Sequence, residues 1–583
     1  MDGQDVEPGK PKPLFYVAVF VVVVGLILFA VYRSDIFAPA GRDQGKVPTL
    51  TKEEMEKLKP KAEAADSNAP TTAKEYKYIP SEKLPPVAGV AGYKALEDNT
   101  VKFALNVWAG WAPIIYANDG FKPKKEWTTA EGKKFKVELV LLDNPVAMRD
   151  AYASGNVHIG WATVDMLPLF MDELRKDKRT WPRVYQQIDW SNGGDGIVAR
   201  DSTKSIASLR GKTVVLAENS PSQYFVLNAL INGGVQPAEV NFKYTEDAFK
   251  AAAAFNADKA VTAAVSWAPD IYNISKVKGN KLLVSTQDAN HLIADVWFAR
   301  ADFAKDCPDI IEGLVRGILT AVDELEAQEK KQAAAKLMAA GYSLPPDDAF
   351  NMLGDAHWTN YAENREFFMN ENNPTNFQRT WDNAYYLYRR IGKITTEKVD
   401  FDQVMDFSVI QKLGKEEQFA KSVNKYITQF APQSVAAVKA EKGEILTKTV
   451  VIHFFANSAD IKHKLIRTVD GKSVEELYDP NADFVIDEIG KLAGQFGAAR
   501  IIIEGHTDAS MKSMGVPFSA VQQLSEQRAN AVRQALLAKF PSLPPNQTGA
   551  AGMGWNVPAN PAQPMDHAKN RRVEVKVYPL EAQ

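Results

Sequence analysis

From about Asn99 the sequence alternates short apolar runs with longer segments of helical periodicity, and this alternation constrains the fold most. We expect strands at residues 101–107, 136–142, 158–161, 213–217, 260–265 and 281–285, and helices at 146–153, 222–231, 248–256 and 308–337. Such alternation predicts parallel α/β sheets covered by helices. Helical, aromatic-rich sequence, clearest at 347–352 and 374–391, continues to about residue 407. One α/β region with a helical extension is therefore expected over residues 99–410.

The N-terminal part contains nineteen consecutive uncharged residues, Leu14–Tyr32, preceded by Lys10 and Lys12. A helix of this length spans the apolar layer of a bilayer, and the lysines favour a cytoplasmic N-terminus. We expect residues 1–13 in the cytoplasm, one transmembrane helix at 14–32, and the bulk in the periplasm, anchored to the inner membrane. The alternative is a cleavable signal peptide, with Ala38-Pro39-Ala40 as its small-residue cleavage site.

Two segments of changed composition divide the remaining chain. Residues 33–98 are rich in Pro, Lys, Glu and Ala without a sustained apolar period, which predicts a flexible linker. Residues 411–446 are charged and Ala-rich and predict a second linker. The last region, 447–583, is expected to form a smaller α+β domain, with strands at 447–455, 500–505 and 572–578 and helices at 482–494 and 519–540.

Composition excludes several classes of function. The 69 basic and 72 acidic residues nearly balance, so a broad nucleic-acid surface is not expected. Cys307 is the single cysteine, which rules out an intrachain disulfide and a multi-thiolate metal site. The sequence has no His-Glu-x-x-His motif and no Gly-x-Ser-x-Gly elbow. We therefore expect no catalytic site, no resident metal and no cofactor.

A pair of charged residues near the C-terminus is suited to a zwitterion. Strand alternation places Glu504, His506 and Asp508 on one face, and Arg528 on the next helix can return close to Asp508. A carboxylate binds an ammonium group while a guanidinium binds a carboxylate in bidentate fashion. The alternatives are a helix cap at Asp508 with a surface charge at Arg528, or a metal site formed by Glu504, His506 and Asp508.

Three motifs extend this interpretation: Gly505-His506-Thr507-Asp508, Leu524-Ser525-x-x-Arg528-Ala529 and Asn570-Arg571-Arg572-Val573-Glu574. Together they resemble the OmpA-like peptidoglycan-binding domain. The resemblance implies that Asp508 and Arg528 hold the diaminopimelate of the peptide stem, with Thr507, Asn570 and Arg571 at the same site. The sequence departs from the family pattern at Val521, where Asn is usual, and in a longer loop at 511–518. Both departures are expected to lower affinity.

The central region gathers aromatic and acidic residues near the ends of its expected strands. Indole faces and carboxylates, with few Lys or Arg among them, favour a cationic ligand such as an amine. The alternative is that the Trp residues belong to the core and the acids cap helices. The candidate ligand residues are Trp108, Trp111, Trp161, Asp165, Asp189, Trp190, Asp195, Glu218, Trp267, Asp270, Asp295 and Trp297.

Ser220-Pro221-Ser222-Gln223 predicts a helix start, with Ser220 as N-cap and Pro221 at the first helical position. Free N–H groups at such a start can bind an anionic group. Ser220 and Ser222 are therefore candidate ligand residues as well. A zwitterionic solute would use both the acids and this helix terminus.

Four segments carry a second resemblance: Asn106 to Pro113, Ala153 to Gly160, Ser208 to Lys212 and Glu218 to Pro221. They resemble type II periplasmic solute-binding proteins of ABC importers, the taurine, sulfonate and nitrate group. The resemblance implies two α/β lobes that close over a small solute, with residues 189–195 near the hinge.

We therefore expect a membrane-anchored, extracytoplasmic solute-binding protein tethered to peptidoglycan. It would deliver or sense a small solute for an ABC-type permease or another envelope partner. The alternative is a structural or stator-like tether between inner membrane and cell wall, in which the binding fold is a scaffold. A motor role is disfavoured because the helix at 14–32 contains no acidic residue.

Overall fold

The computed structural model describes residues 71–580 except 74, 442 and 470–471. The helix predicted at 14–32 and most of the linker predicted at 33–98 lie outside these residues. Within the described residues, no helix combines the length and apolar character needed to span a bilayer.

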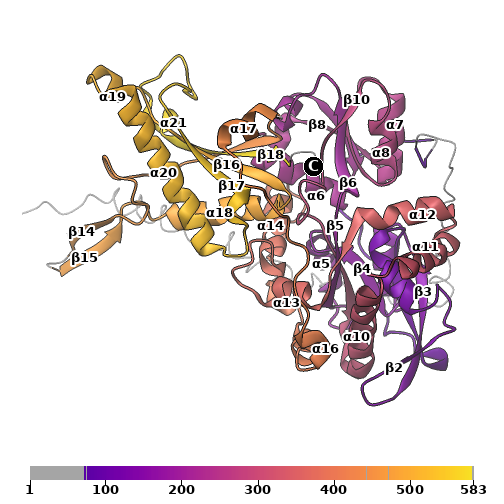
Figure 1. The fold of residues 1–583 in the computed structure, drawn as a ribbon. Coiled ribbons are helices and arrows are strands. Elements are labelled where there is room, and N and C mark those ends of the chain that lie inside the picture. The colour runs from indigo at the N-terminus through magenta and orange to yellow at the C-terminus, as the bar shows by residue number, and fades with distance from the viewer. Residues whose placement is uncertain (1–70, 74, 442, 470–471, 581–583) are drawn as a thin grey trace, which may run out of the picture. The chain divides into compact units, whose positions relative to one another are not determined.

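A seven-stranded mixed sheet forms the first lobe (Figure 1). Strand β1 is parallel to β3 and β4, whereas β11 is antiparallel to both β4 and β5. The strand order is β12-β5-β11-β4-β1-β3-β2, with β1 Thr100–Leu105, β2 Glu126–Thr128, β3 Lys134–Leu141, β4 Ile159–Thr163, β5 Pro182–Ser191, β11 Ala294–Arg300 and β12 Ala356–Trp358. Its helices are α3 Ala112–Ala117, α4 Pro145–Ala153, α5 Leu167–Leu174, α9 Ala301–Asp306, α10 Pro308–Glu324 and α11 Gln328–Tyr342.

A five-stranded sheet forms the second lobe, in the order β10-β6-β9-β7-β8. Its strands are β6 Asp195–Arg200, β7 Thr213–Ala217, β8 Asn241–Thr245, β9 Ala263–Trp267 and β10 Asn280–Ser285, with helices α6 Pro221–Asn232, α7 Ala248–Ala257 and α8 Asp270–Ser275. Strands β7, β8 and β9 are parallel, while β6 is antiparallel to β9 and β10. The expectation of purely parallel sheets is therefore wrong.

The chain crosses between the two sheets twice, at residues 192–194 and again at 286–293. The hydroxyl of Thr286 on the second crossing accepts hydrogen bonds from the N–H groups of Gly193 (2.9 Å) and Asp195 (3.1 Å) on the first. Ser191 and Thr286 also share a hydroxyl hydrogen bond of 2.8 Å. The expected two-lobed arrangement is therefore present, and residues 189–195 lie at the junction of its lobes.

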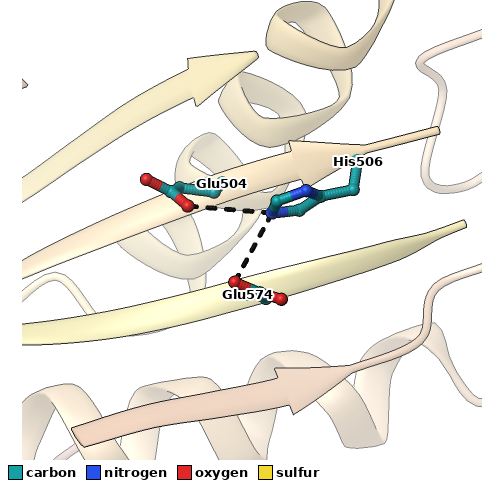
Figure 2. Close-up of side chains that lie close together, drawn as sticks. All are labelled: Glu504, His506 and Glu574. Atoms are coloured by element: carbon teal, nitrogen blue, oxygen red, sulfur yellow. Dashed lines mark ion pairs between the residues drawn. The ribbon is translucent and has the colours of Figure 1, made fainter. Parts of the chain in front are cut away.

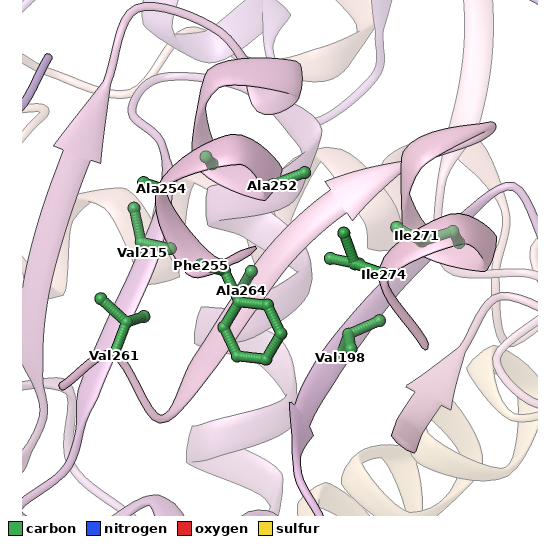
Figure 3. Packing of buried hydrophobic residues seen from close by; sticks show 10 residues of the cluster. Val198, Val215, Ala252, Ala254, Phe255, Val261, Ala264, Ile271 and Ile274 are labelled. Carbon is green, nitrogen blue, oxygen red and sulfur yellow. The ribbon is translucent and has the colours of Figure 1, made fainter. Parts of the chain in front are cut away.

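The second lobe has a compact apolar core between α7, α8 and the sheet (Figure 3). Phe255 lies among Val198, Val261 and Ile274, all fully buried. Ala251, Ala252 and Ala254 of α7 are also fully buried in this core, and their methyl side chains let the helix pack closely. The guanidinium of Arg200 lies 3.8 Å from the centre of the Phe255 ring.

Helical segments after α11 complete the binding region: α12 Pro346–Met352, α13 Tyr361–Met369, α14 Phe377–Arg390, α15 Ser408–Leu413 and α16 Glu417–Ala420. The single helix expected at 308–337 is two, α10 and α11, separated by residues 325–327. Helix α13 begins with a capping box, in which Asn360 accepts from the Glu363 N–H (3.0 Å) and Glu363 accepts from the Asn360 N–H (3.1 Å). Such reciprocal bonds satisfy two otherwise free helix donors.

The segment from residue 71 to 98, expected as part of the first linker, contacts both lobes. In the second lobe, Ile79 forms a β-bridge with Tyr244. In the first lobe, the N–H of Tyr93 donates to Asp302 (3.2 Å). This part of the expected linker therefore packs against the two lobes.

The C-terminal domain is a four-stranded sheet, β13-β18-β16-β17, with α18 Ala482–Gln495 and α20 Phe518–Lys539. Its strands are β13 Leu446–Val450, β16 Ala499–His506, β17 Thr548–Gly554 and β18 Arg572–Pro579. Strand β17 was not predicted, because its sequence Thr-Gly-Ala-Ala-Gly-Met-Gly lacks β-branched residues after Thr548. Its glycines let α20 lie close: a Cβ at Gly552 would fall 2.3 Å from the Gln522 carbonyl oxygen. A hairpin, β14 Lys464–Val469 and β15 Lys472–Leu477, was also not predicted.

Replacing Phe255 by Ala should reduce the free energy of unfolding by about 3–5 kcal/mol, because it leaves a cavity in the core of the second lobe. Urea unfolding followed by circular dichroism measures this loss. The control is Val423→Ala, whose side chain is 61% exposed, with an expected change within about 0.5 kcal/mol. A loss for Phe255→Ala as small as that of the control would contradict the assigned core.

Candidate functional site

Four aspartates meet where the two lobes join. Asp189 near the end of β5 lies directly opposite Asp295 of β11, so the two side chains point to the same face of the sheet. Asp195 begins β6 after the first crossing, and Asp165 follows β4. All four are at most 5% exposed. We call Asp165, Asp189, Asp195 and Asp295 the junction aspartates.

The junction aspartates influence one another electrostatically. Burial, together with the neighbouring carboxylates, raises the pKa of Asp295 well above its usual range, and burial does the same to Asp189. Burial also raises the pKa of Asp165 and of Asp195 to about 7. Within the described part of the chain, no basic side chain forms an ion pair with any of them. Burial therefore favours the protonated forms of these carboxyl groups.

Several polar atoms around this cluster have no hydrogen-bond partner. Both carboxylate oxygens of Asp165 and Oδ1 of Asp189 are fully buried without a well-formed hydrogen bond, although the Thr163 hydroxyl lies beside Asp165 and the Asp295 carboxyl lies beside Asp189. The second oxygen of Asp189 accepts from Trp108 Nε1 (3.1 Å). It also lies close to Gly110, where a Cβ would fall 1.5 Å away. Unpartnered buried carboxylate oxygens are costly, so this region is suited to a ligand that donates hydrogen bonds.

The six candidate tryptophans divide into two groups. The indole N–H groups of Trp111, Trp161 and Trp297 donate to Asn106, to the Leu142 carbonyl and to Gln186 respectively. These three rings are almost fully buried and form part of the core, as the alternative interpretation predicts.

Trp190 is also enclosed, with edge contacts to Phe367 and His291. Trp108 is different because it donates directly to Asp189. Trp267 lies opposite Asp195 in the pairing of β6 with β9 and is half-buried. Trp108 and Trp267 are therefore the two tryptophans adjacent to the junction aspartates.

Two candidate acids bind the N-terminal segment. Asp270 accepts from the N–H and the hydroxyl of Thr72 (2.9 and 3.1 Å). Glu218 accepts from Ser81 (2.6 Å) and from the N–H of Glu82 (2.9 Å), and it pairs with Lys393. These contacts give both carboxylates partners within the protein.

The helix start predicted at Ser220 is present, but its capping differs. Helix α6 begins at Pro221 with Ser220 as N-cap. The Ser220 hydroxyl donates to the Ala217 carbonyl (2.9 Å) and does not cap the helix, so the predicted side-chain cap is wrong. Gln223 instead accepts from the N–H of Asn219 (2.8 Å). The Ser222 hydroxyl is fully buried and unpartnered.

Sequence reasoning missed two neighbours of the cluster. Asp355, just before β12, accepts from the hydroxyl of Tyr272 (2.7 Å), and burial raises its pKa to about 6. Its charge also acts to raise the pKa of Asp195. The hydroxyl of Tyr388 on α14 is buried and unpartnered, and the charge of Asp165 contributes to raising its pKa. Both residues lie in the helical extension, where no strand pattern marks them.

In the C-terminal domain, the carboxylate of Asp508 follows β16 and is 2% exposed. It accepts from the N–H of Ser510 (2.7 Å), lies 3.1 Å from His567 Nδ1, and pairs with Arg571. Burial acts to raise the pKa of Asp508, but these contacts outweigh it and hold the pKa well below the usual range. Asp508 is therefore ionised at neutral pH.

Arg528 on α20 makes different contacts in this structure. Its Nε and Nη2 donate to the carbonyls of Ser458 (3.0 Å) and Phe455 (3.3 Å), and its guanidinium lies 5.1 Å from the Phe454 ring centre. Burial lowers its pKa, while the charge of Asp508 acts in the opposite direction. Asp508 and Arg528, the predicted binding pair, therefore influence each other only through their charges in the described structure. The ion-pair partner of Asp508 is Arg571 instead.

Two further predicted wall-binding residues are enclosed. The hydroxyl of Thr507 is buried without a hydrogen-bond partner. Asn570 is fully buried, donates to the Gln563 carbonyl (2.9 Å) and accepts from the N–H of Asn560 (3.2 Å). Asn570 therefore fixes the loop that precedes Arg571, while the side chain of Arg571 is 53% exposed.

Glu504, His506 and Glu574 place three potential metal ligands within 4.8 Å of one another (Figure 2). His506 Nε2 lies 3.7 Å from Glu504 and 3.6 Å from Glu574.

Basic side chains already neutralise these carboxylates. Glu504 pairs with Lys439 (2.5 Å), Lys576 lies 3.4 Å from Glu504, and Arg572 lies 2.6 Å from Glu574. Contacts with His506 and the lysines lower the pKa of Glu504 to about 2, against the effect of burial. Because a cation in this position would be repelled by three positive charges, the cluster is better described as a buried ion-pair network. Asp508 lies outside this group of three, so the predicted Glu504, His506 and Asp508 set is not formed.

Comparison with known proteins gives two family matches in the chain. Residues 130–331 match the NMT1/THI5-like family and residues 473–572 match the OmpA family. The taurine-binding periplasmic protein of Escherichia coli (strain K12) is 24% identical over 224 residues. That match covers 38% of this chain and 65% of the relative.

Solved structures are similar to part of this chain at low sequence identity. The periplasmic aliphatic sulphonate binding protein SsuA of Escherichia coli is 16% identical, with TM-score 0.42, over 58% of this chain and 98% of its own. The nitrate-binding protein NrtA of Synechocystis PCC 6803 is 14% identical, with TM-score 0.42, over 55% and 90%. The desulfurization enzyme DSZB is 15% identical, with TM-score 0.38, over 54% and 98%. The chain thus combines a region that matches the NMT1/THI5-like family with a C-terminal region that matches the OmpA family.

Proposed function

We propose that this protein is an envelope solute-binding protein that is tethered to peptidoglycan. The observation that carries the proposal is the presence, in one chain, of an NMT1/THI5-like domain and an OmpA family domain. The first domain would bind a small solute between its lobes, and the second would hold the protein at the cell wall. The helix predicted at 14–32 would anchor the chain in the inner membrane.

The solute that we propose is cationic or zwitterionic. The junction aspartates support this proposal because they are buried without a basic partner in the described residues. The taurine-binding relative also supports it, since taurine carries an ammonium group together with a sulfonate. The protein would deliver the solute to an ABC-type permease or report it to another envelope partner. We propose binding without catalysis.

At the wall, we propose that Asp508 and Arg528 recognise the diaminopimelate of the stem peptide. Ionisation of Asp508 supports this role, because only the charged form attracts an ammonium group. The exposed Arg571, now paired with Asp508, would bind a carboxylate of the stem or move aside when the ligand arrives. The hydroxyl of Thr507, which has no partner in the described structure, is a further candidate donor.

Asp508→Asn and Arg528→Ala should each abolish sedimentation with purified peptidoglycan. A charge-assisted hydrogen bond contributes about 1.5–3 kcal/mol, equivalent to at least a tenfold loss of affinity. Sedimentation of the intact chain with wall fragments, combined with circular dichroism, measures binding and folding together. Lys512→Ala, an exposed change in the neighbouring short helix α19 (Ser510–Ser513), is the control. Wild-type sedimentation of both variants would refute the clamp.

A panel of amines, betaines, amino acids, sulfonates and inorganic anions should contain a compound that raises the melting temperature of the intact chain. A ligand at about 100 times its Kd adds about 2.7 kcal/mol to the free energy of unfolding. A thermal-shift assay detects this effect. If no compound in the panel stabilises the protein, the binding fold acts as a scaffold, as the tether hypothesis predicts. Contacts of residues 71–93 with both lobes would then restrain the lobes permanently.

A further inference from the structure

The junction aspartates require positive charge or protons to remain buried. Four carboxylates at most 5% exposed carry no ion pair within the described residues. An isolated buried carboxylate is far less stable than a hydrated one and takes up a proton unless a cation is supplied. The structure therefore allows two states of the cluster, one protonated and one containing a cation.

A second observation indicates that a ligand belongs there. Both oxygens of Asp165 are buried without a well-formed hydrogen bond, and the Thr163 hydroxyl lies beside them. Tyr224 on α6 and Tyr388 on α14 lie close enough for the charge of Asp165 to raise their pKa values. The hydroxyl of Tyr388 is itself buried and unpartnered. Helix α6 belongs to the second lobe and Asp165 to the first. A donor group placed beside Asp165 would thus be enclosed by both lobes and by the helical extension.

The arrangement favours an organic cation over a metal ion. Among the described residues, the one group of three acidic or histidine ligands gathered within 4.8 Å is Glu504, His506 and Glu574. No three of the junction aspartates bring ligand atoms within this distance, so they do not form a metal site with three carboxylate ligands. Their surroundings are aromatic, with Trp108 bonded to Asp189 and Trp267 opposite Asp195. Carboxylates combined with aromatic faces are typical of ammonium binding.

We propose that Asp165, Asp189, Asp195 and Asp295 bind a small organic ammonium ion in exchange for protons carried by the empty cluster. In this exchange the ammonium ion enters with its charge, and about one proton leaves a carboxyl group for the solvent. No covalent bond to carbon forms or breaks. The inference rests on the proposed solute-binding function and specifies its ligand class and its dependence on pH.

The pH dependence has a defined sign. Asp165 and Asp195 bind protons up to about pH 7 in the folded protein, whereas unfolded aspartates are already ionised near pH 4. The free energy of unfolding therefore falls as pH rises from about 4 to about 7, the range in which the folded protein binds more protons than the unfolded chain.

The groups facing these carboxyls are few. Asp295 on β11, with Tyr224 and Tyr388, faces Asp165. Asp355 faces Asp195 from the segment before β12, and Tyr272 on α8 lies between them. Burial raises the pKa of all three tyrosines, so these hydroxyls remain neutral across this window.

Calorimetric titration of the intact chain with putrescine and with choline tests the exchange. Affinity for at least one of them should increase about tenfold from pH 6 to pH 8, as expected for one linked proton with a pKa near 7. Titrations in two buffers of different ionisation heat should report about one proton released per ligand. Asp165→Asn should weaken binding at pH 8 at least tenfold and reduce the pH dependence of the affinity, while Asp195, with a pKa of about 7, retains its own contribution. Asp201→Asn, an exposed change in the second lobe, should alter neither.

Melting temperatures measured without ligand test the proposal even if neither putrescine nor choline fits the site. The melting temperature of the wild-type chain should fall more between pH 4.5 and 7 than that of Asp165→Asn, because this variant lacks one carboxyl whose pKa burial raises to about 7. Equal falls, or an affinity for both cations that is independent of pH, would overturn the exchange. Binding of methanesulfonate or nitrate without either cation would overturn the cation site while leaving the solute-binding function intact. Absence of binding by cations and anions alike would count against both.

Discussion

The antiparallel pairing of β5 with β11 is the constraint on which the binding region depends. The two strands come from opposite ends of the second lobe's sequence, one before it and one after it. Their pairing brings both lobe crossings together, where Thr286 ties them by hydrogen bonds to Gly193 and Asp195. The same pairing sets Asp189 against Asp295. The junction of the lobes and the acidic cluster therefore have a single structural origin.

This strand pairing is electrostatically unfavourable when both carboxyl groups are ionised. Two carboxyl groups held opposite each other in a buried strand pair cannot both ionise at neutral pH unless a positive charge joins them. The acids at the wall-binding end are treated differently, since Glu504 and Glu574 are neutralised by Lys439, Lys576 and Arg572. One protein thus buries acidic clusters in two ways. The compensated cluster is suited to a structural role, and the uncompensated one to a ligand.

In the C-terminal domain, close packing of α20 against the sheet positions Arg528. Glycines at 505 and 552 let α20 lie directly against β16 and β17, since a Cβ at either position would meet the backbone of α20 within 2.3 Å. This contact fixes Arg528 relative to the end of β16, where Asp508 lies. Asp508 itself is held by Ser510, Arg571 and His567, which come from two separate segments. The anionic side of the site is therefore formed before any ligand arrives.

The sequence by itself determined the α/β class, the final α+β domain and the candidate acids, because strand and helix periodicities and the OmpA-like motifs are local patterns. It did not reveal β5 or β17, whose polar or glycine-rich sequences lack the alternation of ordinary strands, nor β11, whose apolar run Val296 to Phe298 is short. Only the tertiary structure decided which acids meet. Strand pairing makes Asp189 and Asp295 neighbours. Glu218 and Asp270 instead accept hydrogen bonds from the segment at 71–82. Contacts between distant segments depend on packing, which no local pattern encodes.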